Sequence, residues 1–210
     1  MQLLQLFKSL FGLKKEEATK DSMKKFLIVG LGNIGEKYND TRHNIGFKIL
    51  DALALKEETT FESRKLGAIA KFRFKGRTFI LLKPATYMNL SGKAVKYWLT
   101  KEKIPFENLL IVCDDLNLPF GSVRVKAKGS DGGHNGLKDI NVLLQNQQYA
   151  RFRFGVGSAF SQGRQSDFIL GKFEGEENDL LTERLEKAIL LIKSFGTAGL
   201  NNTMNTFNGK

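Results

Sequence analysis

The sequence is poor in the side chains on which thiol and metal chemistry depend. Its 210 residues include a single cysteine, Cys113, so neither an intrachain disulfide nor a cysteine-rich metal site is possible. This scarcity fits a reducing compartment, and we expect a cytoplasmic protein. Cys113 follows the apolar run Leu109–Val112. We therefore interpret it as a small core residue, because a nucleophile would need an activated thiolate.

Histidine is almost as rare, and several well-known catalytic signatures are missing. The two histidines, His43 and His134, cannot make a three-ligand zinc site without help from carboxylates. The sequence also lacks H-E-x-x-H, G-x-S-x-G and the phosphate-binding loop G-x-x-x-x-G-K-[ST]. If the chain is an enzyme, we therefore predict that it works without a metal and without a cofactor.

Acidic residues are in the minority. Lys and Arg number 33 against 22 Asp and Glu, which gives a net charge of +11 and a pI near 9.7. A charge of this sign favours polyanions, first nucleic acid and second an anionic membrane surface. A soluble protein that is merely basic is the alternative, so the charge alone assigns no function.

No apolar run is long enough to span a bilayer. Residues 1–22 differ from the rest: Leu3, Leu6, Leu10 and Leu13 recur at three- and four-residue spacing before a charged linker. The segment has no basic leader followed by an uninterrupted apolar core, as a secretory signal would have. We predict an amphipathic extension over residues 1–22 that activity does not need, with a weak membrane or partner helix as the alternative. Residues 23–210 would then form the functional domain.

The rest of the chain is organised around the stretch from Phe26 to Gly46. The apolar run Phe26–Val29 predicts a buried strand, and the G-x-G-x-x-G pattern of Gly30–Gly35 follows it directly. The dinucleotide-binding fingerprint requires a helix that begins within the glycines. Here a polar segment intervenes, and helical spacing resumes only at Ile45. A dinucleotide-binding loop is therefore the less favoured interpretation.

Further along the chain, strand and helix patterns alternate. The run Leu109–Cys113 ends in Asp114 and Asp115, and ligands of open α/β sheets gather where strands end. We predict a single α/β domain in which a mixed, twisted sheet is flanked by helices. The other expected elements are a hairpin of Lys71–Phe74 and Thr78–Leu82, a helix through Trp98, a half-exposed strand Ser122–Lys126 and an amphipathic helix Glu176–Phe195.

A second glycine loop, Gly129–Gly136, precedes a predicted helix from Leu137 to about Leu144. Backbone N–H groups at such a helix start could hold a phosphate or an oxyanion, although a plain flexible connection with a nearby cap is also compatible. The following strand alternates arginine and phenylalanine over Arg151–Gly157. Its arginines are expected to point outward, where they could meet phosphates. The tail, Asn201–Lys210, shows no pattern, and we expect it to be frayed.

The residues that remain for catalysis are a histidine, a carboxylate and several amides. His43 could take a proton from water as general base, while Asp114 would hold its tautomer and stabilise the imidazolium. The amides of Asn33, Asn89 and Asn135 could fix the water and the substrate carbonyl without adding charge. This set suits the metal-free hydrolysis of an activated ester.

Four segments in order resemble the bacterial-type peptidyl-tRNA hydrolase family. They are GLGNIGEKYNDTRHNIGF, KPATYMNLSGKAV, DDLNLPFGSVRVK and GSDGGHNGLKDI, and the likeness extends from Met23 to about Gly171. The resemblance implies an enzyme that uses water to cleave the ester between an N-blocked peptide and the 3′ ribose of tRNA, in translation. We expect it to act as a monomer.

The resemblance also implies roles for individual residues. His43 would be the base and Asp114 its partner. Lys126 and Arg153 would clamp the 5′-phosphate of the tRNA. The residues implied to line the cleft are Asn33, Tyr38, Met88, Asn89 and Asn135.

Three positions depart from the family pattern. Ile34 stands where proline is common, Asn117 where a second acid is usual, and Asp131 at a variable site. Asn117 leaves open how the turn over residues 116–120 is braced. A non-enzymatic rival, an RNA-binding protein, would use the Arg151 and Arg153 face without any need for His43.

Overall fold

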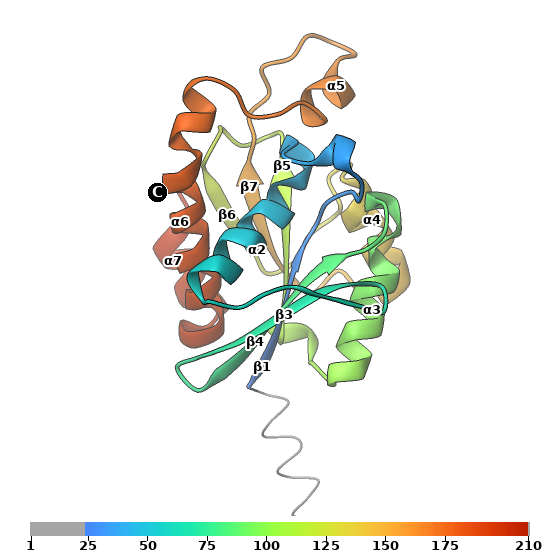
Figure 1. The fold of residues 1–210 in the computed structure, drawn as a ribbon, viewed down its shortest axis with the longest axis vertical. Helices are drawn as coiled ribbons and strands as arrows, with labels where there is room; N and C mark the ends of the chain where they lie inside the picture. The colour runs from blue at the N-terminus through green and yellow to red at the C-terminus, as the bar shows by residue number, and fades with distance from the viewer. Residues whose placement is uncertain (1–23, 210) are drawn as a thin grey trace, which may run out of the picture.

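A computed structural model describes residues 24–209. They form one seven-stranded sheet with the strand order β2-β3-β4-β1-β5-β7-β6 (Figure 1). The central strands β4, β1, β5 and β7 are parallel, whereas β2, β3 and β6 run antiparallel to their neighbours. The predicted mixed sheet in a single α/β domain is confirmed. The predicted extension over residues 1–22 lies outside the described residues.

The strands have the following bounds: β1 Lys25–Gly30, β2 Glu62–Arg64, β3 Gly67–Phe74, β4 Arg77–Pro84, β5 Leu109–Asp115, β6 Val123–Lys126 and β7 Ala150–Gly155. The helices are α2 Ile45–Lys56, α3 Ser91–Glu102, α4 Asn135–Leu144, α5 Gln165–Ile169, α6 Glu176–Ala198 and α7 Leu200–Phe207. Short 3-10 turns are η1 Glu36–Tyr38, η2 Arg42–Asn44, η3 Met88–Leu90 and η4 Phe106–Asn108.

Helices cover both faces of the sheet, so the chain has two apolar layers (Figure 1). On one face α2 and α6 pack on alternate residues of the strands, with Ile28, Val112 and Phe152 among the buried ones. On the other face α3 and α4 cover Val29, Ile111 and Cys113. Central strands buried on both faces read as continuous apolar runs, which is how β1 and β5 appear in the sequence.

The first glycine stretch serves close packing of α2 on β1. A Cβ atom on Gly30 would collide with the backbone of Gly46, and one on Gly32 would lie 2.7 Å from the ring of Phe47. The next α-helix after these glycines begins only at Ile45, so their N–H groups do not open a helix as a dinucleotide loop requires. The two glycines instead let the start of α2 approach the carboxyl end of β1, which brings the preceding turn η2 to that edge of the sheet.

The expectation of a frayed tail is wrong. Residues 200–207 form α7, and Thr203 is fully buried and hydrogen-bonded to Ser194 at 2.9 Å. Beyond the helix, the amide of Asn208 accepts a hydrogen bond from Val125 N at 2.7 Å and donates to Val125 O at 3.0 Å. The side chain thus occupies backbone groups of β6 that an edge strand otherwise leaves unpaired.

Among residues 24–209, no helix combines the length and the apolar character that a bilayer crossing requires.

Candidate active site

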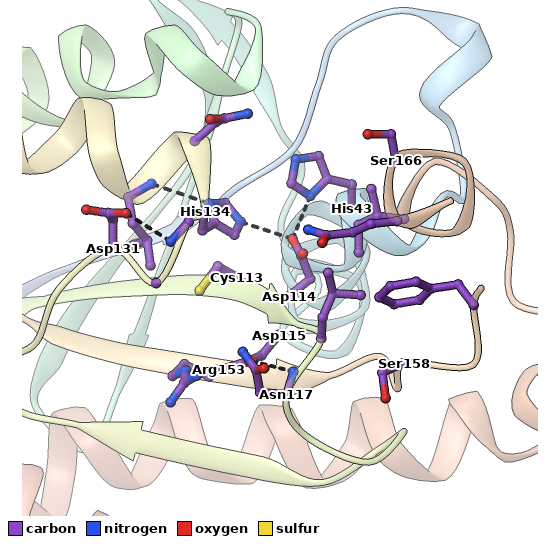
Figure 2. A pocket seen from close by; sticks show the side chains of 18 residues that line it. His43, Cys113, Asp114, Asp115, Asn117, Asp131, His134, Arg153, Ser158 and Ser166 are labelled. Carbon is purple, nitrogen blue, oxygen red and sulfur yellow. Dashed lines mark hydrogen bonds and ion pairs between the residues drawn. The ribbon is translucent and has the colours of Figure 1, made fainter. Parts of the chain in front are cut away.

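The carboxyl ends of β5 and β7 open into a pocket of about 350 Å³. It lies between the second glycine loop, the turn after β5 and the segment that contains α5, as Figure 2 shows. Of the residues predicted for the site, His43, Asp114, Asn135 and Arg153 line this pocket. Parallel strands with ends at one edge place these side chains together although they are far apart in the sequence.

Asp114 is the centre of the pocket's hydrogen-bond network. Its Oδ1 atom lies 2.9 Å from His43 Nδ1 and 3.1 Å from His134 Nε2. The two imidazole rings approach from η2 and from the start of α4, with 5.1 Å between their centroids (Figure 2). Both rings therefore hydrogen-bond to the same carboxylate oxygen of Asp114, a residue that is only 6% exposed. A buried carboxylate needs such partners, because an unpaired charge in the interior is costly.

These contacts hold Asp114 in its charged form. Burial alone raises the pKa of the carboxyl, but the two histidines outweigh it and keep the pKa well below its usual range. For His43 the balance is similar: burial lowers the pKa of the imidazole, while the charge of Asp114 and its hydrogen bond raise it above the usual 6.5. The neutral form of His43, which can accept a proton, is therefore populated as the pH rises through this raised pKa.

The two histidines differ in the nitrogen that remains available. Because ionised Asp114 accepts from His43 Nδ1–H, the lone pair of His43 is on Nε2, which has no protein partner among the described residues. His134 Nδ1 instead accepts from Gly136 N at 3.1 Å and Leu137 N at 3.3 Å. Its ring proton must then lie on Nε2 and point at Asp114. In this arrangement only His43 offers a free basic nitrogen.

His134 is the residue that the sequence did not identify. The alternative interpretation of the second glycine loop was a plain connection with Asn135 near the helix cap, and the structure has the adjacent His134 as the N-cap of α4. Ser, Thr, Asp and Asn are the usual cap residues, so composition gives no hint of this use of histidine. Its contact with Asp114 depends on α4 starting beside the end of β5, which no local pattern predicts.

Three possible metal ligands are close together here, since atoms of His43, Asp114 and His134 lie within 4.8 Å of one another. The hydrogen bonds do not suit that use. His134 Nε2 carries the proton and His43 Nδ1 donates to the same carboxylate oxygen, so neither atom facing Asp114 offers a lone pair. The residues therefore fit a hydrogen-bonded base better than a metal centre.

Asn33 and Met88 belong to a neighbouring flank, built from the loop after β1 and from η3. The side-chain oxygen of Asn33 accepts from Met88 N at 2.8 Å, which leaves the Asn33 amide N–H₂ as a donor for another group. Asn44, which the sequence did not single out, fixes this loop through Asn33 N and Asn33 O at 2.8 and 2.9 Å. Met88 is buried, and its sulfur lies where any side chain at Gly136 would start.

The remaining cleft predictions fall on exposed or partly exposed side chains. Asn89 is exposed in η3, and Tyr38 in η1 lies edge-on to Tyr87 with 6.5 Å between the ring centroids. Asn135, the first residue of α4, is exposed and lines the pocket. The segment 158–166, which we had not linked to the site, also contributes lining residues, including Phe160 and Ser166.

The prediction that both arginines of β7 point outward is wrong for Arg151. Phe152 does face the core as expected, but Arg151 on the other face is only 2% exposed beneath the second glycine loop. Its guanidinium donates to Ser130 O and, at 3.2 Å, to Asn141 Oδ1. Arg151 is therefore a brace for the loop that carries His134 and is not available to a phosphate.

Arg153 is partly exposed and forms an ion pair through Nε with Asp115. Lys126 is exposed at the end of β6, whose neighbouring Arg124 pairs directly with Arg153 in the sheet register. Lys126, Arg124 and Arg153 consequently share one face of the sheet. Asp115 Oδ1 also accepts from Asn117 N at 2.9 Å, which shows how the turn after β5 is braced despite the missing second acid.

Comparisons with known proteins agree on one family. A family model described as peptidyl-tRNA hydrolase matches residues 27–210. The peptidyl-tRNA hydrolase of Phocaeicola vulgatus is 58% identical over 186 residues, covering 89% of this chain and 100% of that protein. The one from Cytophaga hutchinsonii is 50% identical, with coverages of 89% and 99%. A crystal structure of peptidyl-tRNA hydrolase from Acinetobacter baumannii has a TM-score of 0.82 at 35% identity, covering 89% of this chain and 96% of that one.

Proposed function

The chain belongs to the peptidyl-tRNA hydrolase family and hydrolyses peptidyl-tRNA, and from this premise we propose that His43 is the general base. The observation that carries the proposal is the 2.9 Å hydrogen bond from His43 Nδ1 to Asp114. It fixes the tautomer in which Nε2 has a lone pair, on a side chain that lines the pocket. A histidine in this state can take a proton from water.

In the proposed reaction, His43 Nε2 removes a proton as the water oxygen attacks the ester carbonyl. Asp114 stabilises the resulting imidazolium through its charge. The tetrahedral intermediate then expels the 3′ oxygen of the tRNA ribose, which takes the proton back from His43. The products are free tRNA and a peptide with a new carboxylate.

Amide groups are proposed to stabilise the carbonyl oxygen as it gains charge. Asn33 suits this role because its oxygen is occupied by Met88 N, so its N–H₂ group is the one left to donate. Asn89 and Asn135 add exposed amides on the two flanks of the site, and Met88 and Tyr38 would border the peptide and ester. Neutral donors of this kind stabilise developing charge without attracting a competing anion.

The proposal includes hydrolysis without a metal ion, by a monomer in the cytoplasm, on substrates whose amino group is blocked. Peptide release from N-acetyl-aminoacyl-tRNA in the presence of EDTA tests the chemistry. We expect the rate with EDTA to equal the rate without it, because His43 needs no metal to activate water. Loss of activity with EDTA and recovery with one specific metal would contradict the proposal.

Residues 1–22 are proposed to be dispensable for hydrolysis.

Lys126 and Arg153 are proposed to bind the 5′-phosphate of the tRNA. Arg153 is held by Asp115 through Nε, which leaves the terminal N–H₂ groups of the guanidinium to a phosphate. A fixed guanidinium loses little conformational freedom on binding. We expect this pair to discriminate between substrates by their 5′ end.

Arg153→Ala should shrink the preference for 5′-phosphorylated over dephosphorylated substrate in kcat/KM. A charge-assisted contact of this kind is worth about 1.5–3 kcal/mol, roughly a tenfold effect or more. Hydrolysis of a minimal aminoacyl-nucleotide fragment should not change, because His43 and Asp114 are untouched.

Arg124→Ala is the matched control, since Arg124 is exposed beside Arg153 and carries the same charge. This substitution should weaken the binding of phosphorylated and dephosphorylated substrates by the same factor, and it should reduce the salt dependence of binding. If Arg153→Ala behaves in the same way as Arg124→Ala, Arg153 supplies only general attraction and the clamp is wrong.

A further inference from the structure

His134 makes contacts that the proposed reaction does not use. Its Nδ1 atom is occupied by the N–H groups of Gly136 and Leu137, at 3.1 and 3.3 Å. Its Nε2–H lies 3.1 Å from Asp114 Oδ1, the oxygen that also accepts from His43. The ring therefore connects the backbone at the start of α4 to the partner of the base.

The ring is held in this position from several sides. Its own backbone N–H donates to Asp131 O at 3.1 Å, and Gly133 N donates to Asp131 Oδ1 at 2.9 Å. Arg151 braces the same loop through Ser130 O. With both ring nitrogens committed, His134 cannot itself accept a proton from water in this arrangement. Of the two histidines, it is the one whose second ring nitrogen is already occupied.

Two donors that share one carboxylate oxygen compete for its charge. A hydrogen bond that stabilises a carboxylate reduces the carboxylate's pull on any other proton near it. Each proton that His134 presents to Asp114 therefore weakens the stabilisation that Asp114 gives to a protonated His43. If the His134 donor were removed, Asp114 would hold the His43 proton more firmly.

We infer that His134 is a positioning residue that orients Asp114 and takes up part of its charge, which loosens the hold of Asp114 on the His43 proton. The inference rests on the proposed role of His43. Burial lowers the pKa of the His43 imidazole, whereas Asp114 raises it. The inferred effect of His134 is to weaken the second of these two influences, through the shared oxygen of Asp114.

Two substitutions separate the two contacts of His134. His134→Asn keeps an acceptor at the position of Nδ1 and remains a good N-cap, but it lacks a donor that reaches Asp114. His134→Gln keeps a donor near the position of Nε2 and loses the acceptor that caps α4. The other charged groups lining the pocket are Asp115, Asp131 and Arg153. These groups are unchanged in both variants, so their effects on the pKa of His43 are the same in each. The same holds for Arg42, the residue before His43, which pairs with Glu177 at 2.7 Å.

The test is a titration of the His43 imidazole by ¹⁵N NMR in the full chain, with kcat/KM against pH and the melting temperature of each variant. In His134→Asn we expect the pKa of His43 to rise by up to about one unit, the worth of one such hydrogen bond. At acidic pH kcat/KM should then fall by up to about tenfold and recover at alkaline pH, with little change in melting temperature. His134→Gln should titrate like the wild type but melt at a lower temperature.

A His43 titration in His134→Asn that matches the wild type would overturn the inference. So would a loss of kcat/KM in His134→Asn that is equal at every pH, because that pattern indicates a structural defect alone. If the pKa of His43 rises but kcat/KM stays constant across the pH range, the coupling through Asp114 stands. In that outcome it is the role of His43 as the base that fails.

Discussion

We expect His43→Ala to lower the turnover of N-acetyl-aminoacyl-tRNA by about 10²- to 10⁴-fold, the range that general-base assistance contributes. Among the described residues that line the pocket, His43 Nε2 is the basic nitrogen with a free lone pair, and alanine leaves water to attack unaided. Binding of the tRNA should persist, since the proposed phosphate contacts lie on β6 and β7. Single-turnover hydrolysis and a binding assay with uncharged tRNA measure the two quantities separately.

The variant must be shown to be folded for this result to bear on chemistry. His43 is partly exposed, with 14% of its side chain accessible, so its removal leaves no large cavity. We expect a melting temperature close to that of the wild type. A folded His43→Ala protein with near wild-type turnover would rule out His43 as the base.

Asp114→Asn should lower the plateau of kcat/KM by about tenfold or more and move its acidic limb to lower pH. Both histidines donate to Oδ1, and an asparagine oxygen can accept the same two bonds, so the change removes charge with little change of shape. The charge of Asp114 raises the pKa of His43. Without that charge, His43 loses its proton at lower pH but is a weaker base, and its imidazolium is less stabilised.

The sign of the pH effect distinguishes this account from a simple loss of fold. Activity requires neutral His43, so it rises with pH through the pKa of that residue, above 6.5 in the wild type. A limb that moves to higher pH in Asp114→Asn, or an unchanged profile with a uniformly lower rate, would contradict the electrostatic role of Asp114.

Much of the site's frame was predictable because it follows from local patterns. The apolar run of β1, the glycines after it and the late helical spacing from Ile45 indicated that His43 comes just before a helix, after the first glycine turn. The run Leu109–Cys113 likewise predicted that Asp114 ends a buried strand. Parallel neighbours then bring the two residues together.

The features that the sequence did not reveal depend on how helices and loops pack on one another and on the sheet. Arginine and phenylalanine do alternate in β7, but Arg151 is buried because the second glycine loop folds over it. The tail was judged patternless although Leu200, Met204 and Phe207 recur at helical spacing and pack on the core. The asparagines between these apolar residues made the helical pattern hard to recognise in the sequence. The contact between His134 and Asp114 likewise forms only when the start of α4 packs beside the end of β5.

The most direct test of the account compares two titrations of the wild-type protein. One is the pH dependence of kcat/KM for N-acetyl-aminoacyl-tRNA hydrolysis, and the other is the ¹⁵N NMR titration of the His43 imidazole. If His43 is the base, both have the same midpoint, above 6.5, with activity increasing as the imidazole loses its proton. A kinetic midpoint that departs from the His43 titration, or activity that falls as His43 is deprotonated, would contradict the account.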